Sequence, residues 1–540
     1  MTRVALLAES TDASMLAAAD GLACHLVDCG FTVDATPAGA DVVLLIDDRP
    51  LGGAGHAALI AGGVPVLLLG SSLAVHADVT EVVEATGVLP GRPMPVHEVR
   101  LRPGPDAGEL LARVDGDLVV TDSWLQLDKV LDGVEVLLTA MSGLTEHAVM
   151  TWRPSTRVGV LTTGSRPQTL DDPAFRRLVH RWIRHALGRR DGGAVAIGLL
   201  GFGAIGVEHI DAIGAVEGLR LAAVCDKSSA RLDVVRRTAP DVVTYADADV
   251  LLGDDEVDLV IVSTPPNTHA HWGLRALAAG KHVVVEKPFC LTTAEADEMI
   301  AAARDGGRTL AVYQNRRWDS DYLALKSVVR SGRIGEVFHY ESFVGSYGHP
   351  CNFWHSDEEV SGGAVYDWGS HYLDWALDLL PQPVRHVTAA KHKRMWHDVS
   401  NADHSRVTIR FEDGAEAEFT HSDLAAAMKP KWFVLGTQGA LVGHWRHERV
   451  LSRNPVGGLI EDSLAAAESP AAMSMHAVDG SVTALALPPS PRHPFHRELA
   501  DLLLSGAPMS LSPESSRRNI AVMEAATVSA QEDGRTVTPL

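Results

Sequence analysis

Three residues carry the side chains needed to move a proton and to stabilise an oxyanion: Lys287, Asp367 and His371. A histidine can serve as a general base because it titrates near neutral pH, and a lysine ammonium can hold a developing alkoxide and lower its pKa. Asp367 could orient the imidazole or bind a neighbouring hydroxyl. Together these residues could oxidise an alcohol by hydride transfer, provided that a nicotinamide is held beside them.

Each of these residues also has a simpler interpretation. A single histidine in a helix is more often a structural residue, and a single lysine is more often a surface residue. Two features favour chemistry instead. Asp367 precedes His371 by four residues, which places both on one face of a predicted helix over residues 361–380. Lys287 follows a predicted parallel strand, at the edge where such sheets bind ligands.

A glycine-rich turn supplies the site for the nicotinamide cofactor. The apolar run Val195 to Leu200 leads into Gly201-Phe202-Gly203-Ala204-Ile205-Gly206 and then into a helical pattern. Gly201 permits the tight turn, Gly203 leaves room for a pyrophosphate against the backbone, and Gly206 lets the helix pack close to its strand. The turn therefore predicts dinucleotide binding.

The second predicted strand of this domain, LRLAAVC, ends at Asp226. A carboxylate at this position can accept hydrogen bonds from the adenine ribose, and it disfavours the 2′-phosphate of NADP. Lys227, Ser228, Ser229 and Arg231 follow, however, and could bind a phosphate. NAD is the expected cofactor, and NADP use stays open.

Strands and helices alternate after the glycine turn as in a doubly wound dinucleotide fold. Three further motifs fall at the ends of its strands: STPPNTHA (263–270), AGKHVVVEKPF (279–289) and YQNRRWD (313–319). With the glycine turn, these motifs closely resemble those of the Gfo/Idh/MocA family of NAD(P)-dependent oxidoreductases, from about residue 194 to the C-terminus. The most specific is Glu286-Lys287-Pro288.

The resemblance implies that the proline-containing turn shapes the nicotinamide pocket and that Lys287 reaches the substrate oxygen. The family's G-G-x-x-x-D-x-G-x-H pattern matches Gly362, Gly363, Asp367, Gly369 and His371. The expected catalytic residues are Lys287, Asp367 and His371, which with Arg316 would also bind substrate. The expected cofactor-binding residues are Gly201, Phe202, Gly203, Ala204, Ile205, Gly206, Asp226, Thr264, Pro265, Asn267, His269, Glu286 and Lys287.

Other polar and aromatic residues leave two interpretations open. Arg316 and Arg317 could contact substrate or cofactor, or could tie domains together, since guanidinium groups do both. The stretch Tyr347 to His355 could stack on sugar faces, although aromatic residues in a sheet more often serve packing. His349 and His355 lack further ligands for a metal, so no metal site is expected.

Beyond residue 318 the pattern changes to alternating apolar and polar runs separated by turn signals, which predicts an open, mainly antiparallel sheet in an α+β domain. Residues 448–488 lack clear periodicity and are expected to form an irregular insertion. An open sheet exposes one face, so a homo-oligomer, a dimer or tetramer, is expected, as the resemblance also implies.

The first 188 residues alternate strand-like and helix-like segments, which indicates a parallel α/β domain. Their C-terminal half resembles the ThuA-like branch of the class I glutamine amidotransferase-like superfamily, so a flavodoxin-like domain is expected, with a helix capped by Asp172 and begun by Pro173. Where amidotransferases carry a cysteine, the chain has Ser71 and Ser72, with His76 nearby. These serines are interpreted mainly as helix caps, and the domain as either an enzyme-derived module or a docking module.

Composition sets the remaining limits. The chain has 540 residues, 46% of them hydrophobic and 21% charged, enough for several domains. A formal net charge of −22 argues against nucleic acid or an anionic membrane as partner. The N-terminus MTRVALLAES lacks a signal peptide and no apolar run could span a bilayer, so a cytoplasmic protein is expected. The five cysteines suggest neither disulfides nor zinc.

The sequence thus predicts four segments: a ThuA-like domain (1–188), a glycine-rich linker (189–193), a Rossmann domain (194–317) and an α+β substrate and oligomerisation domain (318–540). The expected function is hydride transfer between NAD and a hydroxyl or keto carbon of a sugar, inositol or related polyol. The ThuA-like resemblance of the first domain also favours a sugar substrate, because ThuA-type proteins are associated with disaccharide use, but this step is an analogy only. Two alternatives stay open: a glycosidase that uses tightly held NAD without net oxidation, and a non-catalytic NAD-binding regulator.

Overall fold

The chain was analysed as a computed structural model that describes residues 2–47, 63–70, 72–75, 80–108, 118–188, 194–351, 353–446, 449–453, 459–463, 470–488, 490 and 492–540. It forms two compact units. The first comprises Met1–Gly193, Val216–Gly218 and Arg497–Met509, and the second comprises Ala194–Ala215, Leu219–His496 and Ser510–Leu540. The predicted linker at 189–193 lies outside the described residues, and the predicted domain boundaries stay predictions.

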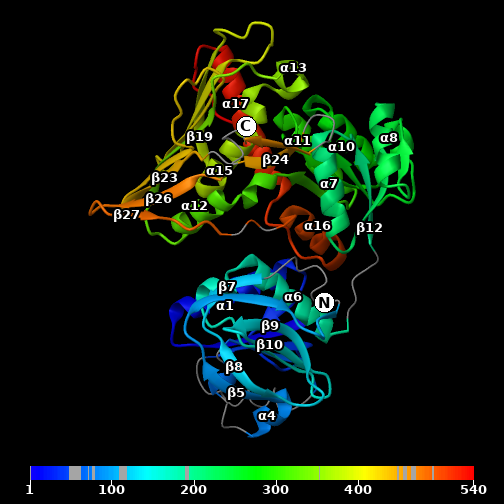
Figure 1. The fold of residues 1–540 in the computed structure, drawn as a ribbon, viewed down its shortest axis with the longest axis vertical. Coiled ribbons are helices and arrows are strands. Elements are labelled where there is room, and N and C mark those ends of the chain that lie inside the picture. The colour runs from blue at the N-terminus through cyan, green and yellow to red at the C-terminus, as the bar shows by residue number, and fades with distance from the viewer. Residues whose placement is uncertain are drawn as a thin grey trace. The chain divides into compact units, whose positions relative to one another are not determined.

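The first unit is built on one large sheet (Figure 1). Its strands are β1 (Arg3–Glu9), β2 (Thr32–Asp34), β3 (Val42–Asp47), β4 (Val66–Leu69), β6 (His97–Pro103), β7 (Leu118–Asp122), β9 (Glu135–Ser142), β10 (Thr145–Arg153) and β11 (Val158–Leu161), with β5 (Val88–Pro93) and β8 (Leu125–Val130) forming a separate pair. Its helices are α1 (Ala13–Asp28), α3 (Ser72–Val75), α4 (Thr80–Thr86), α5 (Pro167–Leu170) and α6 (Pro173–Ala186).

The prediction of a parallel sheet is right for only part of this unit. The strand order is β2-β1-β3-β4-β11-β10-β9-β6-β7, and only β2, β1, β3, β4 and β11 run parallel. For the segments LVVTD (β7) and VEVLLTAM (β9) the prediction is wrong. The cause is local: Ser142 pairs with Thr145 across a two-residue turn in which Gly143 has φ 61°, so β9 must return antiparallel as β10.

The helix predicted after Asp172 is confirmed as α6. The Asp172 carboxylate accepts hydrogen bonds from the N–H groups of Ala174 and Phe175, and Pro173 is the first helical residue. Of the serines considered as nucleophiles, Ser71 lies outside the described residues, as does His76. Ser72 is fully buried, and its hydroxyl donates to the carbonyls of Leu69 (2.7 Å) and Leu45 (3.2 Å). These contacts give Ser72 a structural role, because they attach the start of α3 to the ends of β3 and β4.

The second unit begins with a six-stranded parallel sheet. Its order is β14-β13-β12-β15-β16-β17, formed by β12 (Val195–Leu200), β13 (Leu219–Cys225), β14 (Val243–Tyr245), β15 (Leu259–Val262), β16 (His282–Glu286) and β17 (Leu310–Tyr313). The connecting helices are α7 (Ala204–Ala215), α8 (Ser229–Thr238), α9 (Ala248–Leu252), η2 (Pro266–Thr268), α10 (His269–Ala278) and α11 (Thr293–Asp305). This is the doubly wound order, so the predicted Rossmann fold is confirmed.

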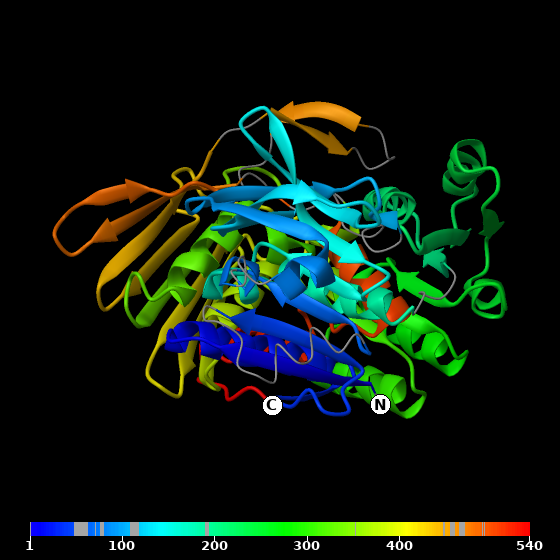
Figure 2. The same cartoon turned by 90° about the horizontal axis from the view of Figure 1, so that it is seen from below.

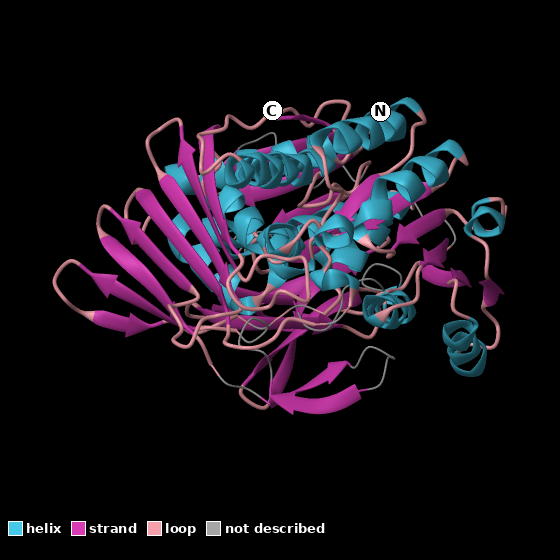
Figure 3. Cartoon of the chain, turned by 90° about the horizontal axis from the view of Figure 1, so that it is seen from above, coloured by secondary structure: helices cyan, strands magenta, loops and turns pink. Residues whose placement is uncertain are grey.

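An eight-stranded sheet follows. Its order is β19-β20-β21-β18-β22-β23-β26-β27, formed by β18 (Val337–Gly345), β19 (Val384–His392), β20 (His404–Phe411), β21 (Glu416–Ser422), β22 (Trp432–Gly436), β23 (Gly439–His444), β26 (Ala472–Ala477) and β27 (Val482–Ala484). Only β18 and β21 pair parallel, so the predicted, mainly antiparallel sheet is confirmed. Figures 2 and 3 show its strands fanning out, seen from opposite sides.

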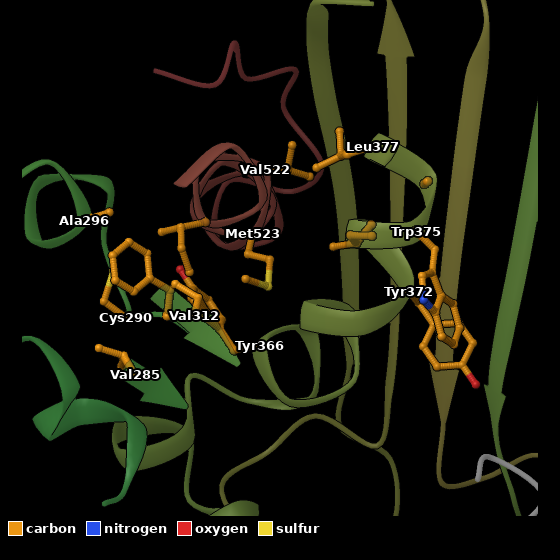
Figure 4. Packing of buried hydrophobic residues seen from close by; sticks show 14 of the residues in the cluster. Val285, Cys290, Ala296, Val312, Tyr366, Tyr372, Trp375, Leu377, Val522 and Met523 are labelled. Carbon is orange, nitrogen blue, oxygen red and sulfur yellow. The ribbon is translucent and has the colours of Figure 1, made fainter. Parts of the chain in front are cut away.

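The helices around this sheet are η3 (Asn315–Trp318), α12 (Ser320–Arg330), η4 (Trp354–Ser356), α13 (Glu358–Ser361), α14 (Ala364–Asp367), α15 (Gly369–Leu379) and α17 (Pro513–Gln531), while α16 (Pro494–Ser505) begins in this unit. One hydrophobic core joins the two sheets. Figure 4 shows Val522 and Met523 of α17 between Ala296 of α11 and Leu377 of α15. This shared core fixes the strand ends of the Rossmann sheet relative to α14 and α15.

The prediction of an irregular insertion at 448–488 is wrong. Its described residues include β26 and β27, which extend the large sheet, and a separate hairpin of β24 (Arg449–Arg453) and β25 (Leu459–Ser463). Met473 is buried beside Ala471, and Asp479-Gly480, with Gly480 at φ 86°, makes the turn to β27. The alternation of apolar residues in these strands is short, and the many alanines and serines around it made it hard to recognise in the sequence.

Candidate active site

The glycine turn has the shape that a dinucleotide needs. Gly201 has φ 98°, and a Cβ on it would lie 2.5 Å from the Ser263 carbonyl oxygen. Around Gly203, by contrast, no heavy atom of the described residues other than Gly203 itself and its chain neighbours lies within 4 Å of the position that a Cβ would take. The open space beside Gly203, with the N-terminus of α7 next to it, fits a pyrophosphate approaching the backbone. These residues therefore fit NAD.

The two glycines should respond differently to alanine. Gly203→Ala should leave the melting temperature within about 2 °C of the wild type, since nothing is displaced, but weaken NAD binding by roughly tenfold or more, the loss of about 1.4 kcal/mol. Gly201→Ala should destabilise the fold by about 1–3 kcal/mol because of its φ and the clash. Calorimetric titration with NAD and thermal unfolding measure both effects; wild-type NAD affinity in Gly203→Ala would contradict this placement of the cofactor.

Asp226 stands at the end of β13, where the sequence predicted it. Its Oδ2 accepts the N–H of Phe202 in the glycine turn (2.8 Å), and its Oδ1 accepts the N–H of Ser228 (2.7 Å). Arg231 lies 3.3 Å from the same carboxylate. Asp226 thus holds the glycine turn in place, and a carboxylate still has acceptor capacity beyond these bonds.

The loop after β15, the second stretch predicted to bind the cofactor, contains Thr264, Pro265 and Asn267, which is exposed. His269 behind it is 1% exposed, and its two ring nitrogens lie 2.8 Å from the carbonyl oxygens of Thr264 and of Pro288. His269 therefore ties this loop to the turn after Lys287. Glu286, 5% exposed, accepts hydrogen bonds from the N–H of Lys287 (3.0 Å) and from His209 (2.7 Å).

Lys287 reaches from the end of β16 to Asp367. Its ammonium donates to the Asp367 carboxylate (2.9 Å) and to the Asp367 carbonyl (3.2 Å). This carbonyl is available because the predicted single helix over 361–380 is wrong: α14 ends at Asp367, α15 begins at Gly369, and the His371 N–H bonds to Trp368 instead. The Ser370 hydroxyl also donates to the Asp367 carbonyl (2.9 Å). A break in helical bonding at a functional position is a recurrent feature.

The charges in the site are set by burial and by one another. Burial alone would raise the pKa of Asp367, but the charges of Lys287, His355 and His421 outweigh it and hold that pKa below its usual value. Burial, followed by the charges of Lys287, Arg316 and Lys431, holds the pKa of His371 well below its usual value. No protein group within the described residues hydrogen-bonds the His371 ring, which is therefore a neutral imidazole ready to accept a proton.

The two arginines of YQNRRWD have separate roles. Arg317 pairs with Asp374 (2.8 Å) and Asp378 (2.9 Å) of α15, so it ties η3 to that helix. Arg316 lies over the ring of Trp368 (5.9 Å) and 3.4 Å from Asp319, and its charge acts on His371. Of the pair, Arg316 is the one that borders the site.

Sequence reasoning missed His421 and Asp423 near Asp367, and it named His355 as a binding residue only within a stretch that could stack on sugar faces. His355 and His421 act on the pKa of Asp367, and Asp423 lies 3.5 Å from His421. Burial lowers the pKa of His421 to about 4 and raises that of Asp423 to about 6. His421 lies on β21 and Asp423 directly follows it, so the register of β21 could have indicated these two, whereas His355 lies in η4, far away in sequence. Among the described residues, no three His, Cys, Asp or Glu side chains are grouped as a metal site.

Comparison with known proteins agrees with this geometry. Residues 195–314 match the profile described as oxidoreductase family, NAD-binding Rossmann fold, and residues 322–442 match the Gfo/Idh/MocA C-terminal domain. The oxidoreductase YdgJ of Escherichia coli is 32% identical over 257 residues, which cover 46% of this chain and 70% of YdgJ. A relative from Schizosaccharomyces pombe, oxidoreductase C115.03, is matched over only 48% of its length.

Two longer matches cover almost the whole of the other protein. The scyllo-inositol 2-dehydrogenase (NADP⁺) IolW of Bacillus subtilis is 27% identical over 64% of this chain and 96% of its own. The crystal structure of an NAD-binding protein from Listeria innocua has a TM-score of 0.54 at 25% identity, covering 64% of this chain and 97% of that one.

The fold and the site thus define an NAD-binding Rossmann oxidoreductase with an antiparallel-sheet C-terminal domain. The chain belongs to the Gfo/Idh/MocA oxidoreductase family, and is accordingly an NAD(P)-dependent dehydrogenase. Within the described residues, the helices are too short or too polar to cross a bilayer.

Proposed function

We propose that the chain oxidises a secondary hydroxyl of a sugar, inositol or related polyol, or reduces the corresponding ketone. The observation that carries the proposal is the Lys287 ammonium held by the carboxylate and carbonyl of Asp367, beside the neutral ring of His371, which has no hydrogen-bond partner among the described residues. These groups gather at the carboxyl end of β16, next to the cofactor turn. A cation and a base in one place are what alcohol oxidation requires.

Each side chain has a defined task in this proposal. The Lys287 ammonium donates a hydrogen bond to the substrate oxygen and stabilises it as an alkoxide, and His371 takes the hydroxyl proton. Asp367 holds the Lys287 ammonium aimed at the site through its carboxylate and its carbonyl. Bound NAD supplies the hydride acceptor. In the reverse direction His371, protonated, returns the proton to the carbonyl oxygen.

The polyol class is supported by the relatives and by the polar surroundings of Asp367. IolW, matched over most of its length, is named for a scyllo-inositol substrate. His355 and His421, which act on the pKa of Asp367, and Asp423 beside His421 add groups that can bind hydroxyls. NAD is the proposed cofactor because the Asp226 carboxylate occupies the place where a 2′-phosphate would need a cation. IolW is named for NADP⁺, so Arg231, half exposed beside Asp226, keeps dual use within the proposal.

We also infer that the first unit is ThuA-like and that the chain acts as a homo-oligomer. The parallel strands β2-β1-β3-β4-β11 support the first inference. The second is supported by the large sheet, which packs on α15 and α17 and whose strand β18 carries the exposed side chain of Phe338. Substrate and cofactor sites would lie between α14 and the Rossmann strands in each copy.

Incubation of the protein with NAD⁺ and a panel of inositols, aldoses, ketoses and glucosides tests the proposal. We expect NADH, detected by absorbance, together with the keto product of at least one polyol, detected by mass spectrometry. Hydrolysis of a glucoside without accumulation of NADH would contradict the dehydrogenase proposal and indicate an NAD-dependent glycosidase instead. NAD binding without conversion of any compound would contradict it as well and indicate a non-catalytic regulator.

A further inference from the structure

His355 stands on a firmly anchored segment between β18 and α14. Its carbonyl accepts a hydrogen bond from the Asn401 side chain (2.7 Å), and the ring of Trp354 stacks on its imidazole at 3.7 Å with an interplanar angle of 20°. The segment then forms α13, which packs against η2 of the cofactor loop, and continues through Gly362 and Gly363 into α14. The backbone and one ring face of His355 are thereby fixed.

The imidazole of His355 lies near the charges that would hold the reacting oxygen: η4, which carries His355, packs on α13, and α13 packs on α14, which ends at Asp367. Burial lowers the pKa of His355, the Asp367 carboxylate opposes this effect, and the Lys287 ammonium adds to it. The net result is a pKa below the usual value, so the ring is neutral at neutral pH. A neutral imidazole offers one donor and one acceptor nitrogen.

Among the residues that the structure describes, neither nitrogen of the His355 ring has a hydrogen-bond partner, although the residue is half-buried. His349, six residues earlier, differs: its Nε2 lies 2.8 Å from the Asp398 carboxylate and its Nδ1 faces the Pro350 carbonyl. A held, half-buried polar ring without a partner, next to a substrate site, indicates a ligand contact.

We propose that His355 is a substrate-binding residue that holds a second hydroxyl, on the carbon next to the one oxidised, so that the preferred substrates are vicinal diols. This inference rests on the proposed function. Lys287 and Asp367 engage the reacting hydroxyl, and a hydroxyl on the adjacent carbon is the nearest further group that a side chain near both of them can reach. A ring pinned by Trp354 binds this hydroxyl at little cost in side-chain entropy.

The test compares wild type with His355→Ala and His355→Gln on a polyol that the wild type oxidises and on its deoxy analogue, which lacks the adjacent hydroxyl. His355→Ala should lower kcat/KM on the diol by about 10- to 100-fold, mainly through KM, and the deoxy analogue should cost the wild type a similar factor. On the deoxy analogue, wild type and His355→Ala should be nearly equal. His355→Gln, which keeps a donor and an acceptor, should recover part of the loss on the diol.

Two controls separate binding from folding. NAD affinity and melting temperature should be unchanged in the His355 variants, and His349→Asn, a matched change in the same segment, should keep wild-type kcat/KM. Equal kcat/KM of wild type and His355→Ala on the diol would overturn this inference but leave the proposed function standing. The same holds if loss of the His355 side chain and loss of the adjacent hydroxyl lower kcat/KM independently of each other. Absence of turnover by the wild type on every polyol would overturn the proposed function and this inference with it.

Discussion

Lys287→Met should lower kcat for polyol oxidation by about 10³-fold or more while leaving NAD affinity within about twofold of the wild type. Methionine has a similar length but no charge, so the alkoxide loses its stabilising cation. The Asp367 carboxylate then also loses the partner that holds its pKa down, since burial alone raises it. Steady-state kinetics and NAD titration of the purified variant measure both quantities.

Lys429→Met is the matched control for this substitution. Lys429 lies in the loop between β21 and β22, where its half-exposed side chain pairs with Glu341. Its loss should change kcat by less than about twofold, because exposed ion pairs contribute little. If Lys287→Met kept more than a tenth of the wild-type kcat, Lys287 would not be the cation that stabilises the substrate oxygen.

His371→Ala should lower kcat by about 10²- to 10⁴-fold, the usual contribution of a general base. In the wild type, kcat/KM for oxidation requires neutral His371 and therefore falls as pH drops through its pKa. Burial and the charges of Lys287, Arg316 and Lys431 place this pKa well below the ordinary histidine value. The rate should thus stay level through pH 6.5 and decline only in more acidic solution.

The pH profile of kcat/KM for the wild type and for His371→Ala checks this assignment. The acidic decline should disappear from the residual activity of the variant. His339→Asn, on the large sheet beside Glu416, should retain the full profile of the wild type. An acidic decline that persists unchanged in His371→Ala would assign it to another group and exclude His371 as the base.

The sequence was sufficient for features that depend on local pattern. The glycine turn, the strand ending at Asp226 and the strand before Lys287 all occupy the predicted positions, because alternating apolar strands and turn residues are encoded within short windows. The cap at Asp172 is equally local. The family motifs then brought Lys287 and Asp367, distant in sequence, into one site.

Features that depend on distant contacts were not predictable in this way. The break between α14 and α15 is invisible in the spacing of Asp367 and His371, which suits a continuous helix. At the break the Asp367 carbonyl accepts a hydrogen bond from Lys287, 80 residues earlier, and such a long-range contact is not encoded in local spacing. The effect of the Asp367 and Lys287 charges on His355 likewise depends on the path of the segment between β18 and α14. The antiparallel half of the first sheet depends on a turn at Gly143. This glycine is a turn signal in the sequence, but the prediction of a parallel sheet did not take it into account.

The central claim is that the chain removes a hydride from the carbon that bears the hydroxyl held by Lys287. It is tested most directly with a polyol identified in the substrate panel and labelled with deuterium on that carbon. We predict one deuterium in the NADH recovered from the wild-type reaction, a lower kcat than with the unlabelled polyol, and loss of both signals in Lys287→Met. Unlabelled NADH, or hydrolysed product without NADH, would contradict the account.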